Sequence, residues 1–301
     1  VSDGNLDGDT QRRKLHDFVL LAQPLAPCKP VVSRQTSLAV RRRRLAAIMA
    51  TTCGDEEPMI SKARGLLLSG LSILWGGSLL GSFAVLPAAE PGVGRVPLPL
   101  RLLSSATLVL ASWVIRGGKR KGPAKQFGHQ IAKGMTWGFI GDVCMLVSVP
   151  LGMLTFGIGH IEYSRGMWRL GNEEGVGRGR RLLAWAAWMA IGIAGYVFVV
   201  HMGPKGGTML AWAALPYTLL LSTTAGLASG LFLHKARYFP LALGAALFLA
   251  SDLLIAMRMF HPDLFAQIPD WIRGDLVWLL YGPGQALIVS SVLWASEEEQ
   301  P

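Results

Sequence analysis

Six stretches of this sequence are apolar over the length that a helix needs to cross a bilayer. A membrane-spanning helix takes about 20 apolar residues, because the hydrocarbon core is ~30 Å thick and each residue adds about 1.5 Å. Backbone groups in lipid must hydrogen-bond within their own segment, so such stretches fold as helices. The stretches are Leu66 to Leu86, Leu98 to Ile115, Leu182 to Val200, Thr208 to Leu233, Phe239 to Phe260 and Leu276 to Ala295. They predict an all-α protein that crosses the membrane several times.

A further stretch, from Ile131 to Met167, is too long for a single crossing. One helix over it would be about 55 Å long, and Pro150 would interrupt it near the middle. Two crossings joined by a tight turn between Ser148 and Gly152 match the hydrocarbon thickness better. The expected fold class is therefore a polytopic transmembrane bundle of eight helices.

The basic residues predict the orientation of this bundle. With a cytosolic N-terminus, 24 of the 29 Lys and Arg residues lie on the cytosolic side of the eight helices. Loops rich in Lys and Arg remain in the cytosol, so we expect both termini there. The net charge of +10 does not indicate a nucleic-acid-binding protein, because the basic residues cluster between apolar segments and only 16% of the chain is charged.

The composition divides the chain into three parts. Residues 1–65 mix acidic and basic residues and include the run Arg41 to Arg44, which indicates a mostly disordered cytosolic tail. This tail could also be an upstream extension of the native product, since Met49 and Met59 precede the first span, or a transit peptide, although its acidic residues disfavour that. Residues 66–295 are the expected eight-helix membrane domain, and residues 296–301 form a short acidic tail.

Several ionisable or polar side chains fall inside the expected spans. A charged group at the membrane centre costs at least ~2.5 kcal/mol, so each such residue is a candidate site residue. Counting the helical rise from each helix end puts five of them in one layer. They are Asp142, His160, Asp252, Tyr281 and Gln285. Tyr163 lies three residues after His160 and shares its helix face, whereas Glu162 points away.

Two carboxyl groups at one depth suggest acid–base chemistry. No Lys or Arg lies within one helical turn of Asp142 or Asp252, and close carboxyl groups are expected to share a proton, which provides one acid and one base. Tyr281 and Gln285 could instead only join helices by hydrogen bonds. Arg101 could bind a phosphate group bidentately or extend to lipid headgroups as an ordinary interfacial residue.

Four segments of the chain resemble the signature segments of the YhhN-like lysoplasmalogenase family. They are residues 134–142, which end in Gly141-Asp142, residues 160–163, residues 244–252, which end in Ser251-Asp252, and residues 281–285. The resemblance extends from Leu66 to Ala295. It implies an integral membrane enzyme that hydrolyses the vinyl ether of lysoplasmalogens, without a metal or organic cofactor.

The resemblance and the intramembrane residues together suggest a mechanism. Vinyl ether hydrolysis needs a proton donor and a nearby anion that stabilises the oxocarbenium ion and activates water. We expect Asp142 and Asp252 to supply this pair and His160 to relay or tune the proton. Tyr163, Tyr281 and Gln285 would order water and substrate, and Arg101 would bind the phosphate.

Two other classes of function remain open from the sequence alone. One is a proton-coupled transporter, because intramembrane Asp and His residues also build proton relays, and the other is a non-catalytic lipid-binding protein. The expected partners are a vinyl-ether lysophospholipid and the bilayer itself. The membrane would be the cell membrane of a bacterium, or the endoplasmic reticulum or another internal membrane of a eukaryote. The sequence leaves the oligomeric state open.

Overall fold

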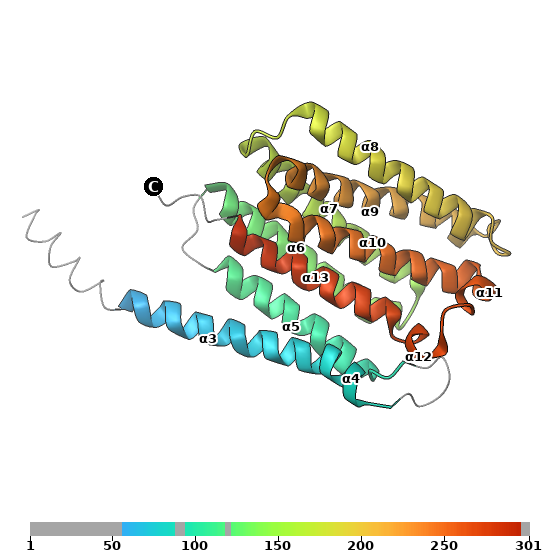
Figure 1. Ribbon diagram of the computed structural model, residues 1–301, viewed down its shortest axis with the longest axis horizontal. Coiled ribbons are helices and arrows are strands. Elements are labelled where there is room, and N and C mark those ends of the chain that lie inside the picture. The colour runs from blue at the N-terminus through green and yellow to red at the C-terminus, as the bar shows by residue number, and fades with distance from the viewer. Residues whose placement is uncertain (1–55, 88–93, 118–121, 296–301) are drawn as a thin grey trace, which may run out of the picture. The chain divides into compact units, whose positions relative to one another are not determined.

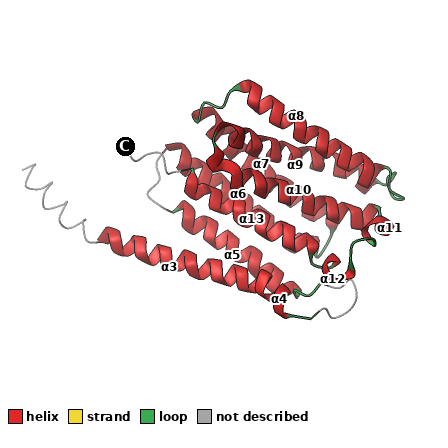
Figure 2. Cartoon of the chain, in the orientation of Figure 1, coloured by secondary structure: helices red, strands yellow, loops and turns green. Residues whose placement is uncertain are grey.

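The computed structural model describes residues 56–87, 94–117 and 122–295, with side chains from residue 62 onward (Figure 1). Within these ranges the chain is 87% helical and contains no strand, as Figure 2 shows. The all-α prediction is therefore confirmed. The predicted tail over residues 1–55 and the acidic tail over residues 296–301 lie outside the described residues.

Eight long helical segments follow one another in the described chain. Their bounds are α3 Glu56–Gly76, α5 Leu98–Arg116, α6 Gly122–Met145, α7 Val149–Glu173, α8 Arg178–Gly195, α9 Met209–His234, α10 Phe239–Phe260 and α13 Leu276–Trp294. Short helical elements extend or connect them: η1 Gly77–Gly81, α4 Ser82–Val85, η2 Tyr196–His201, η3 Ala236–Tyr238, α11 Pro262–Phe265 and α12 Asp270–Arg273. Helix α3 begins at Glu56, so the last part of the predicted tail is helical.

Six of the eight segments are long and apolar enough to cross a membrane, which fits a multi-pass membrane protein. They are α3 with η1 and α4, α5, α8 with η2, α9, η3 with α10, and α13. Helices α6 and α7 are comparably long, but they carry more polar and charged residues and are not among the six.

The stretch from Ile131 to Met167 is divided into two helices, as predicted, but the break is earlier than expected. The chain turns at residues 146–148, and α7 has already begun at Val149. The Ser148 side chain accepts a hydrogen bond from the backbone N–H of Leu151, and Pro150 lies in the first turn. Proline is tolerated there because the first helical N–H groups have no partner within the helix.

Six of the long helices form a closed ring. Helix α5 packs on α6, α6 on α7, α7 on α9, α9 on α10, α10 on α13, and α13 returns to α5. Helix α8 packs outside this ring on α9, while η1, which continues α3, contacts α5 and α13. Figure 1 shows α3 and α8 at opposite edges of the packed helices. The spans that contain α3 and α8 are 17% and 22% buried, against 39–50% for the other four, so these two are peripheral.

The distribution of side chains is the reverse of that in a water-soluble protein. Large apolar side chains face outward, for example Ile73 and Leu183, which are 75% and 69% exposed. Small hydroxyl side chains lie between the helices, for example Ser104, Ser222 and Ser291, which are at most 1% exposed. Helices in lipid associate through small and hydrogen-bonding residues, because apolar surface gains nothing by leaving hydrocarbon.

Glycines allow the ring helices to approach closely where the site residues lie. A Cβ on Gly244 of α10 would be 2.6 Å from the carbonyl oxygen of Gly284 on α13. A Cβ on Gly134 of α6 would overlap the ring of Tyr163 on α7. Both positions require glycine because any larger residue would push the two helices apart.

A polar cluster joins two loops at the end of the ring where α7 and α9 finish. The carboxylate of Glu174 accepts hydrogen bonds from Arg237 and Tyr238, and Nζ of Lys235 lies 2.8 Å from Oε2. Burial alone would raise the pKa of Glu174, but the bonds from Lys235 and Tyr238 and the charge of Arg237 outweigh it and lower the pKa. The α7–α8 loop is thereby fixed to the start of α10.

Candidate active site

Asp142 is presented by α6 and is bound by hydroxyl groups from two neighbouring helices. Its carboxylate Oδ2 accepts hydrogen bonds from Ser105 of α5 at 2.5 Å and from Tyr281 of α13 at 3.0 Å. The residue is 8% exposed. These two neutral donors fix the orientation of a carboxyl group that has no ion-pair partner in the described chain.

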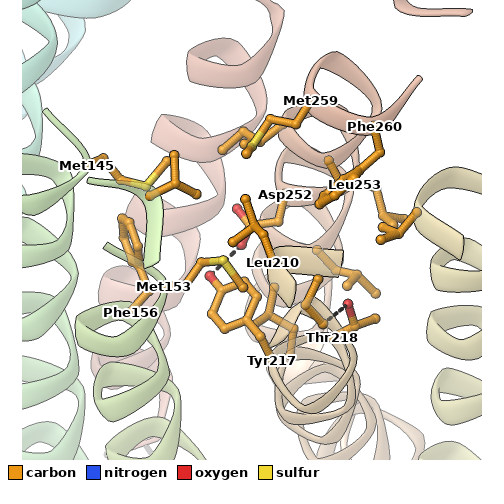
Figure 3. A pocket seen from close by; sticks show the side chains of 17 residues that line it. Met145, Met153, Phe156, Leu210, Tyr217, Thr218, Asp252, Leu253, Met259 and Phe260 are labelled. Atoms are coloured by element: carbon orange, nitrogen blue, oxygen red, sulfur yellow. Dashed lines mark hydrogen bonds between the residues drawn. The ribbon is translucent and has the colours of Figure 1, made fainter. Parts of the chain in front are cut away.

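Asp252 is presented by α10 in a similar way. The hydroxyl of Tyr217 on α9 donates to Oδ2 at 2.5 Å, and Ser251 donates to Oδ1 at 3.4 Å. Figure 3 shows the Tyr217 side chain reaching Asp252 from α9. Asp252 also has no ion pair within the described ranges, so each of the two carboxyl groups is bonded by neutral hydroxyl donors.

Both carboxyl groups line one cavity of about 270 Å³, which we call the polar cavity. It lies at the end of the ring where α5 and α13 begin and α6 and α10 end. Besides Asp142 and Asp252, its lining includes Tyr281, Ser251, Trp278, Phe156 and the three arginines Arg101, Arg258 and Arg273. The cavity thus combines two unpaired acids with cationic groups.

The other predicted site residues form a second cluster, deeper between the same helices. The Tyr163 hydroxyl donates to Oε1 of Gln285 at 3.1 Å, and Nδ1 of His160 lies 3.1 Å from Oγ1 of Thr224. The ring of Phe248 packs against His160, with centroids 4.5 Å apart, and against Tyr281, at 5.3 Å. No hydrogen bond joins His160 to Asp142 or Asp252, so its part in proton transfer stays a prediction.

Arg101 lines the polar cavity, but its guanidinium is already bonded to the protein. Nη2 lies 2.9 Å from Oδ1 of Asp275, and Nε donates to the carbonyl oxygen of Val96 at 2.7 Å. Asp275 is 2% exposed and also accepts hydrogen bonds from the backbone N–H groups of Arg95 and Val96. Arg101 and Asp275 thus fasten the loop before α5 to the start of α13, and the phosphate contact of Arg101 stays a prediction.

A second, smaller pocket adjoins the polar cavity. This apolar pocket has a volume of about 60 Å³ and is lined mainly by aliphatic and thioether side chains, among them Met153, Leu210 and Met259 (Figure 3). Met145, Phe156, Asp252 and Ile255 line both spaces. Asp252 therefore lies at the junction of a charged space and an apolar one.

Sequence reasoning missed three residues that hold the site together. Ser105 and Tyr217 bond the two carboxyl groups, and Asp275 bonds Arg101. Ser105 and Tyr217 are polar residues inside apolar spans, so the rule that identified Tyr163 and Tyr281 could have identified them had it been applied to every hydroxyl side chain. Asp275 precedes the last span and gives no comparable signal.

The arrangement is suited to proton transfer next to a bound ligand. Two hydrogen-bonded carboxyl groups line one cavity, so both can face the same ligand, as a general acid and a general base would have to. Within the described ranges, no group of three or more His, Cys, Asp or Glu side chains is placed to hold a metal ion together.

The comparisons with known proteins cover the same ring of helices. The family model described as the YhhN family matches residues 98–292, from the first residue of α5 into α13. No curated protein and no solved structure matches the chain. The matched segment contains five of the six ring helices whole, α13 as far as Val292, and both acids of the candidate site.

Proposed function

Because the chain belongs to the YhhN family, we propose that it is a membrane-embedded lysoplasmalogenase. Its reaction would cleave the vinyl ether of lysoplasmenylethanolamine or lysoplasmenylcholine to a fatty aldehyde and glycerophosphoethanolamine or glycerophosphocholine. The observation that carries this proposal is the pair Asp142 and Asp252, two hydrogen-bonded carboxyl groups without ion-pair partners in the described chain, on one cavity.

In the proposed reaction, one carboxyl group donates its proton to the β-carbon of the vinyl ether. The double-bond electrons form the new C–H bond, which leaves an oxocarbenium ion beside the second, ionised carboxylate. That carboxylate stabilises the oxocarbenium ion and accepts a proton from the water molecule that attacks this ion. The hemiacetal then collapses: the first carboxylate takes back a proton from the hemiacetal O–H, and the second carboxyl group gives its proton to the departing glycerol oxygen. The products are an aldehyde and the glycerol hydroxyl, both carboxyl groups return to their starting state, and the net consumption is one water molecule.

The hydroxyl donors around the carboxyl groups support this chemistry. A hydrogen bond from Tyr281 or Tyr217 holds each carboxyl group in one orientation without adding a charge. Tyr163 and Gln285, which bond to each other, would order water and substrate on the α7 and α13 side. His160 would act as a positioning residue, through the Phe248 ring that packs on Tyr281.

We further propose that all eight long helices cross the membrane, with both termini in the cytosol. The length of α6 and α7, their separation by a tight turn, and the clustering of basic residues in the sequence support this topology. Residues 66–295 would be the membrane domain, in the cell membrane of a bacterium or an internal membrane of a eukaryote. The polar cavity would then open on the side away from the cytosol.

Aldehyde release from purified protein tests the proposed function. The protein in lipid nanodiscs is incubated with lysoplasmenylcholine and, in parallel, with the alkyl-ether analogue that lacks the double bond. We expect aldehyde from the vinyl ether only, because the alkyl ether has no carbon that can be protonated in this way. If no aldehyde forms, while the lipid binds or crosses the bilayer, the protein is a lipid-binding protein or a transporter.

A further inference from the structure

Three arginines line the polar cavity, and they differ in their bonding. Arg101 pairs with Asp275, and Arg273 pairs with Asp270 and donates to the carbonyl oxygen of Ala266. Within the described ranges, Arg258 has neither an ion pair nor a hydrogen bond, and its side chain is exposed. Arg258 is therefore the cavity arginine whose five N–H donors are available to a ligand.

Arg258 and Asp252 lie on the same helix, a short distance apart. They are six positions apart on α10, which is ~9 Å along the helix axis. Both line the polar cavity, and only Asp252 also lines the apolar pocket. From the end of α10 inward, the cation Arg258, unpaired within the described ranges, thus comes first and the acid Asp252 second, and the apolar pocket lies beside Asp252.

We propose that the ligand lies across Asp252, with a phosphate on Arg258 and the start of a single aliphatic chain in the apolar pocket. The inference rests on the proposed function for the identity of the reacting bond, but the binding arrangement can be measured separately. It assigns the phosphate to Arg258 in place of Arg101, whose guanidinium is occupied by Asp275.

The chemistry of each end fits its proposed occupant. A guanidinium binds a phosphate with two parallel charge-assisted hydrogen bonds, which gives both strength and orientation. The pocket walls from Met153, Leu210 and Met259 offer apolar and adaptable surface, as an alkyl chain requires. At about 60 Å³ the pocket is too small for a whole hexadecyl chain, so it would hold only the start of one chain.

A lysophospholipid has the length and order of groups that this arrangement needs. Its phosphate and the ether oxygen of its chain are joined by the three-carbon glycerol. With the phosphate on Arg258, the glycerol would extend along α10 and the ether would lie beside Asp252. The chain would then leave through the junction formed by Met145, Phe156 and Ile255.

Equilibrium binding tests the phosphate contact without requiring turnover. The probes are radiolabelled 1-hexadecyl-glycerophosphocholine, which cannot be hydrolysed by this chemistry, and 1-hexadecylglycerol, which lacks the phosphate. We expect Arg258→Gln to weaken the first ligand about tenfold or more and to leave the second unchanged, as for the loss of hydrogen bonds to a charged group. The matched control is Arg178→Gln, an exposed arginine at the start of α8 outside the cavity.

The chain contact needs a second pair of variants. Ala214 on α9 lines the apolar pocket, whereas its neighbour Ala213 is exposed on the same helix. We expect Ala214→Leu to weaken binding of the hexadecyl ligand and of an octyl ligand severalfold, because the added atoms fill the space that the start of either chain needs. Ala213→Leu should change neither.

The outcomes separate this inference from the proposed function. The phosphate assignment is overturned if Arg258→Gln weakens binding of both hexadecyl ligands equally. It is also overturned if the variant weakens binding of neither, because Arg258 then contacts only bulk lipid headgroups. If Arg101→Lys weakens binding of the phosphate-containing ligand alone and Arg258→Gln does not, the phosphate is bound by Arg101. If the binding pattern holds but no vinyl ether is cleaved, the proposed function fails and the binding arrangement stands.

Discussion

The hydroxyl of Tyr217 on α9 donates a hydrogen bond to Asp252 on α10, with 2.5 Å between the two oxygens. Tyr281 on α13 makes the equivalent bond to Asp142 on α6 at 3.0 Å. Each acid of the cavity is thus held by a tyrosine from another helix of the ring. A carboxyl group bound in this way has one orientation toward the cavity, which matters for any proton transfer that it performs.

Removal of the Tyr217 hydroxyl should slow the reaction more than it weakens binding. We expect Tyr217→Phe to lower kcat about tenfold and to change KM less than threefold. The hydrogen bond orients the carboxyl group of Asp252, and the Tyr217 hydroxyl is not proposed to bind the substrate itself. The measurement is the rate of aldehyde release at several lysoplasmenylcholine concentrations.

Tyr196→Phe is the matched control for this substitution. Tyr196 is 5% exposed, and its hydroxyl has no hydrogen-bond partner in the described chain, so the loss of its oxygen breaks no bond. An equal decrease of kcat in both variants would mean that the effect of Tyr217→Phe is not due to Asp252.

The two carboxyl groups should act as one unit. We expect Asp142→Asn and Asp252→Asn each to reduce aldehyde release at least 100-fold, since acid or base catalysis contributes about 10²- to 10⁴-fold. The double variant should be no slower than either single variant. The control is Asp263→Asn, which changes an exposed acid in α11, just after the end of α10. If Asp142→Asn or Asp252→Asn retains more than a tenth of the rate, the substituted aspartate has no part in the mechanism.

The ion pair at the cavity rim should contribute to stability. We expect Asp275→Ala to lower the free energy of unfolding by about 2 to 4 kcal/mol, because it leaves the largely buried charge of Arg101 without its carboxylate. Thermal unfolding in detergent measures the loss. The double variant Asp275→Ala with Arg101→Leu should regain part of it, and failure to regain any would argue against the ion pair as the cause.

Glu174 should make the stability of the other end of the ring depend on pH. Its pKa in the folded protein is lowered, so its contribution is complete above its unfolded pKa and is lost as the pH falls through the folded value. We expect Glu174→Gln to reduce stability by about 1 kcal/mol at pH 7 and to make the variant less sensitive to acid than the parent. The measurement is the free energy of unfolding between about pH 3 and about pH 7. If Glu174 has no such role, stability will fall by the same amount in the parent and in the variant as the pH is lowered.

Single cysteines can test the proposed topology at the two ends of the segment formed by α8 and η2. Gly177 and Gly207 lie in the loops before and after this segment, and a Cβ added at either glycine would meet open space. In a protein without its native cysteines, Gly207→Cys should react with an impermeant maleimide in intact cells. Gly177→Cys should react only after permeabilisation, and the reverse pattern would contradict the proposed orientation.

The helices and the identity of the two acids could be predicted from the sequence because both depend on local properties. An apolar run of about 20 residues is helical in lipid whatever surrounds it, and a carboxyl group within such a run avoids the lipid. Asp142, Asp252 and Tyr281 were expected in one layer, and all three line one cavity. The rise per residue is a property of each helix alone, so it predicts depth without knowledge of the neighbours.

The bonding partners depend on which helices are neighbours in the ring, and no helix sequence specifies that by itself. His160 was expected next to the acids, but its depth did not reveal that Phe248 lies between it and Tyr281. The sequence predicts that Arg101 binds a phosphate or extends to lipid headgroups, and it gives no sign of Asp275, which the fold brings to Arg101 from a position 174 residues later in the chain. The sequence alone thus indicated which polar residues lie inside the helices. The tertiary structure decided which of them meet, because contacts across the ring depend on the order and rotation of six helices together.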